Sequence, residues 1–396
     1  MKNRIWLSLA HMGGNEQTYI QEAFDTNWVA PLGPNVDTFE KEIASFLRSD
    51  KKVVALSAGT AAIHLGLMQL GVGPGDEVLC QSFTFVASAN PVTYLGATPV
   101  FVDSEPDTWN MSPVFLEEAI VDRIRQTGKK PKAIVPVHLY GMPAKMDEIT
   151  QVADKYEIPV LEDAAEALGS RYKGQMCGTL GELACLSFNG NKIITTSGGG
   201  VLVCSTKEQA CKTLFLSTQA RDEAPYYQHS EIGYNYRMSN ICAGIGRGQM
   251  EVLASRVKQR RQNNRFYREQ LQDMDGLSFH TEPSADFYSN YWLTCILIDP
   301  MKTNGLTCED IRIALDKANI ETRLFWKPMH LQPVFQDCPF YGDGTSEMLF
   351  DKGLCLPSGT SLTPQQLSFV SECLRNIIEA KRYTGVTYRL PEIERA

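Results

Sequence analysis

The fold is decided by residues 159–200, which begin PVLEDAAEALGS and end LACLSFNGNKIITTSGGG. The first apolar run ends in an acid pair whose second member is Asp163. The second apolar run ends at Ser187, and Lys192 follows in a loop of Gly, Asn, Thr and Ser. The order of a strand ending in Asp, a strand ending in Ser and a loop carrying Lys is more informative than the spacing between them.

An aldehyde cofactor that must also accept electrons requires these residue types. The amine of Lys192 can hold the aldehyde as a Schiff base, and the carboxylate of Asp163 can keep a pyridine nitrogen protonated. Hydroxyl groups such as that of Ser187, together with backbone donors, suit a phosphate. The sequence therefore predicts pyridoxal 5'-phosphate (PLP) as cofactor, with Lys192 and Asp163 as the catalytic residues.

Both catalytic candidates also have ordinary interpretations. Most lysines are solvated surface charges, but the loop around Lys192 is poor in charge and lies between apolar strands. Asp163 could cap the helix that follows its strand, a role compatible with cofactor binding.

Seven short β-rich runs predict the large sheet, and most alternate with helical stretches such as 60–70 and 144–156. Continuous apolar strands separated by helices indicate an α/β protein with a mostly parallel sheet buried on both faces. The runs are Val53–Leu56, Glu77–Cys80, Pro99–Asp103, Ala133–Val137, Pro159–Asp163, Leu183–Ser187 and Gly200–Cys204.

A second, smaller lobe is expected because 396 residues are many for one core. A long helical pattern runs from Ser239 through Arg261 and becomes increasingly charged, as a solvated helix face leaving the large domain would. A few strands (292–298) and two helices (308–318 and 365–381) follow. We predict an N-terminal arm at 1–15, a large PLP-binding domain at 16–255 and a small α+β domain at 256–396.

The composition excludes several classes of protein. A net charge of −8 argues against nucleic-acid binding, and no apolar run is long enough to span a membrane. The N-terminus lacks the apolar core and cleavage site of a secretory signal, so we expect a cytoplasmic protein. The 11 cysteines form no C-x-x-C pair. We interpret them as buried reduced thiols rather than disulfides or metal ligands, and expect no metal.

Ser57-Ala58-Gly59-Thr60 is the candidate phosphate site. It closes a strand and opens a helix, and small residues there let a phosphate approach the backbone N–H groups at the helix N-terminus. Strand-to-helix turns often use Gly and Thr for purely structural reasons. Ser187 and the run Gly198–Gly200 fit the same pocket.

At these residues the chain resembles the DegT/DnrJ/EryC1/StrS sugar aminotransferases, which share the aspartate aminotransferase fold (PLP fold type I). The resemblance spans nearly the whole chain. It is carried by HMGGNE, TNWVAPLGP, SAGTAAIHLGL, SFTFVASANP, HLYGMPAKMDEI, EDAAEALGS, SFNGNKIITTSGGG, GYNYRMSN, WKPMHLQPVF and LCLPSGT. It implies a seven-stranded large domain, a smaller C-terminal domain and a homodimer with shared active sites.

The resemblance also implies cofactor contacts beyond the opening motif. Phe85 is similar to the ring that stacks on the pyridine, although the sequence alone favours a core position for it. Glu166 is expected beside the ring and on the same helix face as Asp163, with a surface glutamate as the alternative. Asn235 resembles an asparagine that relatives donate across the dimer interface to the phosphate.

For the substrate, the resemblance points to an N-terminal segment and to a late group of residues. An arginine suits a diphosphate and an aromatic ring can stack on uracil. A structural salt bridge remains the alternative for Arg237, and a structural role the alternative for His330. The predicted substrate residues are Asn27, Trp28, Val29, Ala30, Arg237, Arg323, Trp326 and His330.

The sequences of these motifs are most similar to those of family members that aminate C4 of UDP-4-keto-6-deoxy-N-acetylglucosamine in the bacillosamine pathway, with L-glutamate as donor. Three alternatives stay open. A PLP-dependent sugar dehydratase would carry histidine where this chain has Lys192. An aminotransferase on a GDP- or dTDP-linked 4-keto sugar, of the perosamine type, differs in a few loop residues. A non-catalytic PLP-fold sensor would be expected to lose Lys192 or gain a DNA-binding appendage.

Overall fold

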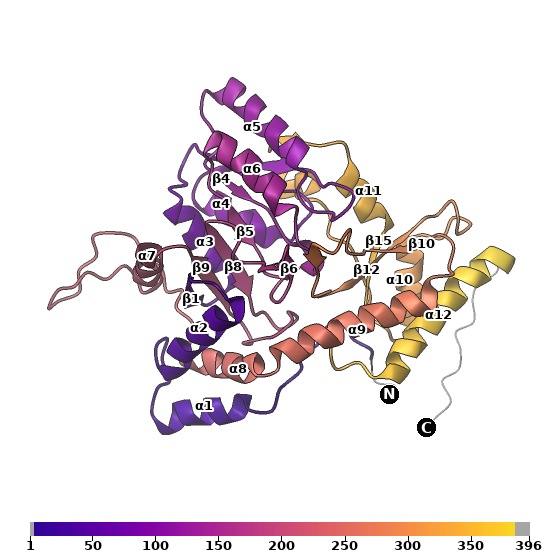
Figure 1. Ribbon diagram of the computed structural model, residues 1–396, viewed down its shortest axis with the longest axis horizontal. Coiled ribbons are helices and arrows are strands. Elements are labelled where there is room, and N and C mark those ends of the chain that lie inside the picture. Colours follow the sequence, from indigo (N-terminus) through magenta and orange to yellow (C-terminus); the bar gives the residue numbers. More distant parts are fainter. Residues whose placement is uncertain (1–3, 385–396) are drawn as a thin grey trace.

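The computed structural model describes residues 4–384, and its centre is one large, mostly parallel sheet (Figure 1). Two hydrogen-bonded sets, β1-β9-β8-β5 and β4-β2-β3-β14, meet through parallel bridges that join Ile134 to Val160 and Val137 to Asp163. Within this sheet β9 is antiparallel to both of its neighbours. The strands are β1 (Lys52–Leu56), β2 (Glu77–Gln81), β3 (Thr98–Val102), β4 (Ala133–Val135), β5 (Leu161–Asp163), β8 (Leu183–Ser187), β9 (Gly200–Cys204) and β14 (Phe340–Tyr341).

All seven predicted strands are present, and β14 is an eighth that the sequence analysis missed. Two residues are too few to produce a recognisable apolar run. This strand pairs in parallel with β3, so a segment from late in the chain returns to the edge of the large sheet.

Helices cover both faces of the large sheet. Along β9, Val201 and Val203 pack into one apolar cluster, while Leu202 and Cys204 pack into another on the opposite face. This alternation buries both faces and explains why the strands are continuously apolar. The helices up to the lobe junction are α1 (Glu16–Asp25), α2 (Pro34–Leu47), α3 (Gly59–Gln69), α4 (Asn90–Tyr94), α5 (Pro113–Thr127), α6 (Met146–Tyr156), α7 (Lys207–Ser217) and α8 (Asn240–Met250).

The predicted long helix from Ser239 is two helices, because the chain breaks at Glu251 and Val252 between α8 and α9 (Leu253–Leu271). Figure 1 shows α9 leading away from the large sheet toward the second lobe. That lobe has an antiparallel sheet of order β10-β12-β15-β13. Its elements are β10 (Leu277–Phe279), β12 (Thr294–Ile298), α10 (Cys308–Lys317), β13 (Arg323–Leu324), α11 (Thr345–Lys352), β15 (Gly353–Leu356) and α12 (Pro364–Thr384).

Part of the predicted N-terminal arm packs in the core of the small lobe. Ile5 is buried among small-lobe side chains and forms a parallel bridge with Ile320. A separate three-stranded ribbon, β11-β6-β7, uses β6 (Arg171–Tyr172), β7 (Gln175–Met176) and β11 (Phe287–Tyr288). Ile5, in the predicted arm, packs in the small lobe, and β14, in the predicted small domain, pairs with the large sheet. The domain boundaries therefore stay a prediction.

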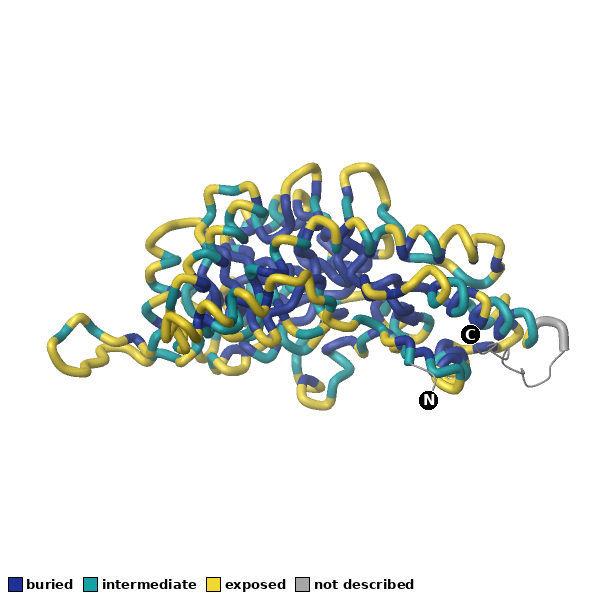
Figure 2. Tube along the Cα trace, turned by 90° about the horizontal axis from the view of Figure 1, so that it is seen from below, coloured by how far each residue is buried: buried dark blue, intermediate teal, exposed yellow. Residues whose placement is uncertain are grey.

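The buried interior lies along the sheets, while the loop that joins α7 to α8 is exposed (Figure 2). Of the cysteine thiols, Cys211 is exposed and Cys242 and Cys338 are half-buried, so the expectation that all are buried was wrong for these three. Between residues 4 and 384 no helix is both long and apolar enough to cross a membrane.

Candidate active site

A cavity of about 1070 Å³ lies at the carboxyl ends of β5 and β8, where the large sheet faces the small lobe. Ligands of open parallel sheets usually bind beyond the carboxyl ends of the strands. The cavity gathers predicted residues from segments far apart in the sequence. Those lining it are Ala58, Gly59, Thr60, Phe85, Asp163, Glu166, Ser187, Lys192, Arg323 and Trp326.

Lys192 is held between a carboxylate and an aromatic face. Its Nζ lies 3.2 Å from Glu166 Oε1 and 4.4 Å from the centre of the Trp292 ring. The side chain is 12% exposed, so the amine faces the cavity rather than bulk water. The interpretation of Lys192 as a solvated surface lysine does not fit this environment.

Glu166 is buried, not on the surface. Besides Lys192 it accepts a hydrogen bond of 2.7 Å from the backbone N–H of Tyr140. Burial raises the pKa of Glu166 to about 7, against the opposing effect of the Lys192 ammonium. The carboxyl group can therefore hold or release a proton near neutral pH.

Replacing Glu166 by glutamine should change how stability depends on pH. Because the carboxyl pKa is raised in the folded chain, its contribution to stability falls as pH rises from about 4.5 to about 7. The Glu166→Gln variant should therefore gain up to about 3 kcal/mol relative to wild type across this window. Urea unfolding of both cofactor-free proteins at pH 5, 6, 7 and 8 measures the free energy of unfolding. The prediction is contradicted if this free energy depends on pH in the same way in both proteins.

Asp163 ends β5 and is buried at the base of the cavity. Its Oδ2 accepts a hydrogen bond of 2.6 Å from Ser88 Oγ, and its Oδ1 accepts one of 3.1 Å from Ala165 N. The predicted helix after Asp163 is absent, because residues 164–170 form turns. The idea that Asp163 and Glu166 share a helix face was therefore wrong; the turns themselves bring both side chains to the cavity.

The end of the cavity that is predicted to bind phosphate is built by close backbone packing. A Cβ on Gly200 would lie 2.5 Å from Ala58 C and Gly59 N, so only glycine lets β9 approach the start of α3 this closely. The first N–H groups of α3, beginning at Gly59, have no intrahelical acceptor, and Gly59 and Thr60 line the cavity together with Ser57 and Ser187. This end of the cavity suits an anion.

An amine, a buried carboxylate and a helix N-terminus in one cavity fit PLP, whose aldehyde, pyridine nitrogen and phosphate need these three groups. The sequence pattern of the DegT/DnrJ/EryC1/StrS aminotransferase family matches residues 10–375. The chain belongs to this family.

Relatives and solved structures agree with this membership. The chain is 50% identical to "Putative pyridoxal phosphate-dependent aminotransferase EpsN" of Bacillus subtilis (strain 168), over 97% of this chain and 99% of that protein. It is 36% identical to the GDP-perosamine synthase of Escherichia coli O157:H7, covering 93% and 97%. The PLP form of "Putative sugar aminotransferase Spr1654" from Streptococcus pneumoniae superposes with a TM-score of 0.87 at 26% identity, covering 96% and 100%.

As a DegT/DnrJ/EryC1/StrS family member, the chain is a PLP-dependent sugar aminotransferase with PLP fold type I. Enzymes of this kind take a nucleotide-linked keto sugar and an amino donor. The prediction of an enzyme rather than a non-catalytic sensor is confirmed.

Several predicted residues lie outside the cavity of their own chain. Asn240, at the start of α8, hydrogen-bonds the backbone carbonyls of Trp28 and Ala30, and the run Asn27, Trp28, Val29 and Ala30 is largely exposed. Asn235 is exposed and accepts a hydrogen bond of 3.1 Å from Gln219. Their roles stay predictions.

Two further predicted substrate residues have structural partners. Arg237 donates to Glu40 and to the carbonyl of Ala55. His330 Nδ1 lies 2.7 Å from Ser82 Oγ, and its ring stacks on Phe340 at 3.7 Å. These contacts match the structural interpretations, a salt bridge for Arg237 and a packed histidine for His330.

Phe85 is 52% exposed and lines the cavity, so the core position favoured by sequence alone was wrong. Its ring centre lies 5.6 Å from that of Trp326. The sequence analysis also missed Ser88, Tyr140 and Trp292. Ser88 and Tyr140 lie in the SFTFVASANP and HLYGMPAKMDEI segments, two of the motifs that carry the family resemblance, so these motifs could have pointed to them. Trp292 precedes β12 and lies in no such motif.

Proposed function

We propose that this chain transfers an amino group from L-glutamate to C4 of UDP-4-keto-6-deoxy-N-acetylglucosamine, for bacterial glycan synthesis. The observation that carries the proposal is the cavity that combines Lys192, Glu166 and Asp163 with the N-terminus of α3. The choice of nucleotide and sugar rests on the similarity of the sequence motifs to the bacillosamine-pathway members of the family.

In this proposal each side chain has a distinct task. When bound, PLP supplies an electron sink and a carrier for the amino group. Lys192 anchors it and then moves a proton to and from the reacting carbon. Asp163 stays anionic to keep the ring nitrogen protonated, and Glu166 exchanges a proton beside Lys192.

The remaining cavity residues bind and orient. The N-terminus of α3, with Thr60 and Ser187, holds the phosphate, and Phe85 covers one side of the ring. Arg323 and Trp326 lie on the small-lobe side of the same cavity, where a diphosphate and a nucleobase would extend. Arg323 is paired with Glu321 at 2.7 Å and must exchange this partner for the diphosphate.

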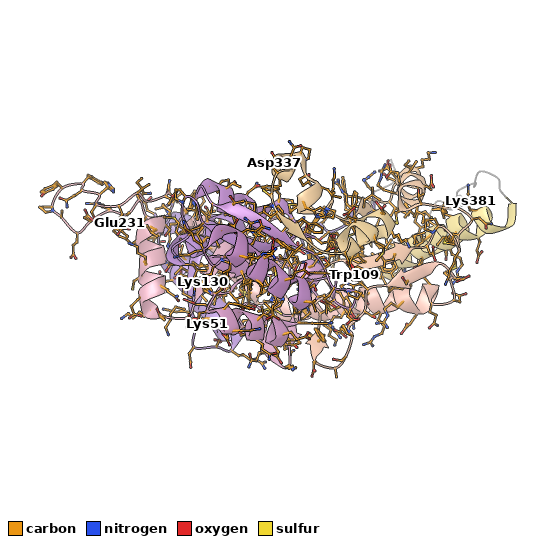
Figure 3. All side chains as sticks on the ribbon, turned by 90° about the horizontal axis from the view of Figure 1, so that it is seen from above. Lys51, Trp109, Lys130, Glu231, Asp337 and Lys381 are labelled. Atoms are coloured by element: carbon orange, nitrogen blue, oxygen red, sulfur yellow. The ribbon has the colours of Figure 1, made fainter. Side chains whose placement is uncertain are left out.

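We further propose a homodimer in which Asn235 and the run 27–30 complete the partner's site. The loop between α7 and α8 projects from the body, and Glu231 lies near its base, where it pairs with Lys212 of α7 (Figure 3). It carries strongly exposed apolar side chains, namely Tyr226, Tyr227 and Ile232. Exposed apolar groups on a protruding loop favour burial against another subunit.

A panel of UDP-, GDP- and dTDP-linked 4-keto-6-deoxy sugars, each with L-glutamate, tests the substrate. We expect the highest kcat/KM with the UDP-linked N-acetylhexosamine. The second candidate is a GDP-linked 4-keto sugar, favoured by the 36% identity to a GDP-perosamine synthase. Preference for the GDP-linked sugar would replace the first candidate by the second.

Asp163→Asn should keep the shape of the site but remove its negative charge. We expect the half-reaction with L-glutamate to slow on the order of 100-fold, with a smaller loss of cofactor affinity, because electrostatic stabilisation at the ring nitrogen is lost. Stopped-flow absorbance of the bound cofactor measures the rate. Ser88→Ala is the matched control, since it removes a hydrogen bond to Asp163 but leaves the charge. An unchanged rate in Asp163→Asn would reduce Asp163 to a structural role.

A further inference from the structure

Arg260, on α9, is a buried cation without a carboxylate partner among the residues that the structure describes. Its side chain is 1% exposed, and burial, together with the nearby Arg256, lowers the pKa of its guanidinium to about 9. A buried charge is costly unless hydrogen bonds compensate it. The hydrogen bonds that Arg260 makes must therefore offset the cost of burying its charge.

The guanidinium joins two segments that are far apart in the sequence. One Nη donates to the backbone carbonyl of Trp292, and the other donates to Ser8 Oγ at 2.9 Å. Ser8 belongs to the N-terminal arm, while Trp292 immediately precedes the first buried strand of the small-lobe sheet. A planar guanidinium, which donates through two Nη groups in fixed directions, is suited to holding both segments at once.

Both partners of Arg260 converge on the residue before Lys192. Ser8 Oγ and Trp292 Nε1 each donate to the backbone carbonyl of Asn191, both at 2.8 Å. The indole of Trp292 in turn lies 4.4 Å from Lys192 Nζ. Arg260 is thus linked to Lys192 without touching it, through Trp292, whose ring faces the amine, and through Ser8, which binds the residue before Lys192.

Trp292 is also tied to the carboxylate side of the site. Asn290 Oδ1 accepts a hydrogen bond from Trp292 N, and its Nδ2 donates to the backbone carbonyl of Glu166, both at 2.8 Å. The indole therefore has a fixed position relative to Lys192 and Glu166 alike.

We propose that the indole face of Trp292 is a seat for the nitrogen of Lys192, and that Arg260 is a positioning residue that holds this seat through Trp292 and Ser8. An aromatic face attracts a cation, so the seat favours the protonated form of the Lys192 nitrogen and fixes its direction. The inference rests on the proposed role of Lys192 as the cofactor-binding amine and goes beyond it.

The seat is tested on the holoenzyme without substrate, from the pH midpoint of the cofactor absorbance change that reports protonation at Lys192. Trp292→Leu removes the aromatic face and should lower this midpoint by roughly half to one unit. Trp292→Phe keeps an aromatic face and should shift the midpoint less. A wild-type midpoint in Trp292→Leu would overturn the seat.

Arg260→Lys tests the positioning role because it keeps the positive charge but loses the two-armed geometry. We expect the midpoint to fall in the same direction as in Trp292→Leu, by a smaller amount. In the Trp292→Leu background Arg260→Lys should add nothing, since effects exerted through a shared partner are not additive. Should Arg260→Lys fail to fold, Ser8→Ala, which removes one of the two contacts to Asn191, is expected to shift the midpoint likewise.

Arg256→Lys is the matched control. Arg256 lies one turn earlier on α9 and donates to the N-terminal arm at His11 O and Met12 O, without contacting Ser8 or Trp292. Its midpoint should equal that of wild type. An equal shift in both arginine variants, or an Arg260→Lys shift that persists without Trp292, would overturn the positioning role.

These outcomes are separable from failure of the proposed function. Lack of reaction with L-glutamate or with UDP-linked sugars contradicts the proposed function but leaves the midpoints measurable. If Lys192→Ala retains the pH-dependent absorbance, another lysine holds the cofactor, and both the assignment of Lys192 and the seat are wrong.

Discussion

Lys192→Ala is expected to lower aminotransferase turnover by ~10⁴-fold or more, because one substitution removes both the amine proposed to hold the cofactor and the group proposed to carry the proton. The geometry supports this, since the Lys192 amine faces the cavity and lies 3.2 Å from Glu166. The variant should still bind PLP through the phosphate end of the site, at the N-terminus of α3.

Steady-state turnover with the best sugar of the panel, and cofactor content by absorbance, measure the two parts of this prediction. Lys207→Ala, at an exposed position on α7, is the matched control and should behave as wild type. Substantial residual transamination in Lys192→Ala would mean that a different lysine is the anchor.

A mixed dimer of Lys192→Ala and Asn235→Asp subunits is expected to regain activity that each homodimer lacks. If Asn235 lies beside the partner's cofactor phosphate, as proposed, Asn235→Asp places a carboxylate there, and the repulsion between like charges should weaken PLP binding. If Asn235 acts on the partner's site, one site of the mixed dimer carries both defects and the other carries none. Activity should then return to about half that of wild type, by this count of sites.

Different affinity tags on the two subunits allow the mixed dimer to be purified after co-expression. The structure motivates the test, because Asn235 is exposed and absent from the cavity lining of its own chain. If Asn235 acts within its own chain, every site carries one defect. Purified mixed dimers as inactive as the two parents would therefore rule out the shared site.

Sequence alone could predict the large sheet and the residues that form the centre of the candidate site. Each of the seven strands is a continuous apolar run because both faces of the sheet are buried, and such runs are visible without tertiary information. Asp163 and Ser187 end two of these strands, and Lys192 lies in the loop that follows Ser187. Local order along the chain therefore brings them to one cavity.

The sequence analysis chose Asp163 from the acid pair at the end of β5, but the local pattern does not show which member of the pair faces the cavity. Successive strand residues point to opposite faces. Asp163 lines the cavity, whereas Glu162 is fully buried on the other side, where it accepts hydrogen bonds from the N–H groups of Gly178, Leu180 and Gly181. The face that each carboxylate takes depends on which neighbours cover the sheet.

Tertiary structure alone decided the surroundings of Lys192. Ser8, Arg260 and Trp292 are separated from it by about 180, 70 and 100 residues of chain, yet hydrogen bonds connect them to Asn191, the residue that precedes it. No local pattern marks residues whose partners come from another lobe, because their role arises only when the lobes pack. For the same reason the sequence identified the candidate reacting groups but not the side chains that the structure places around them.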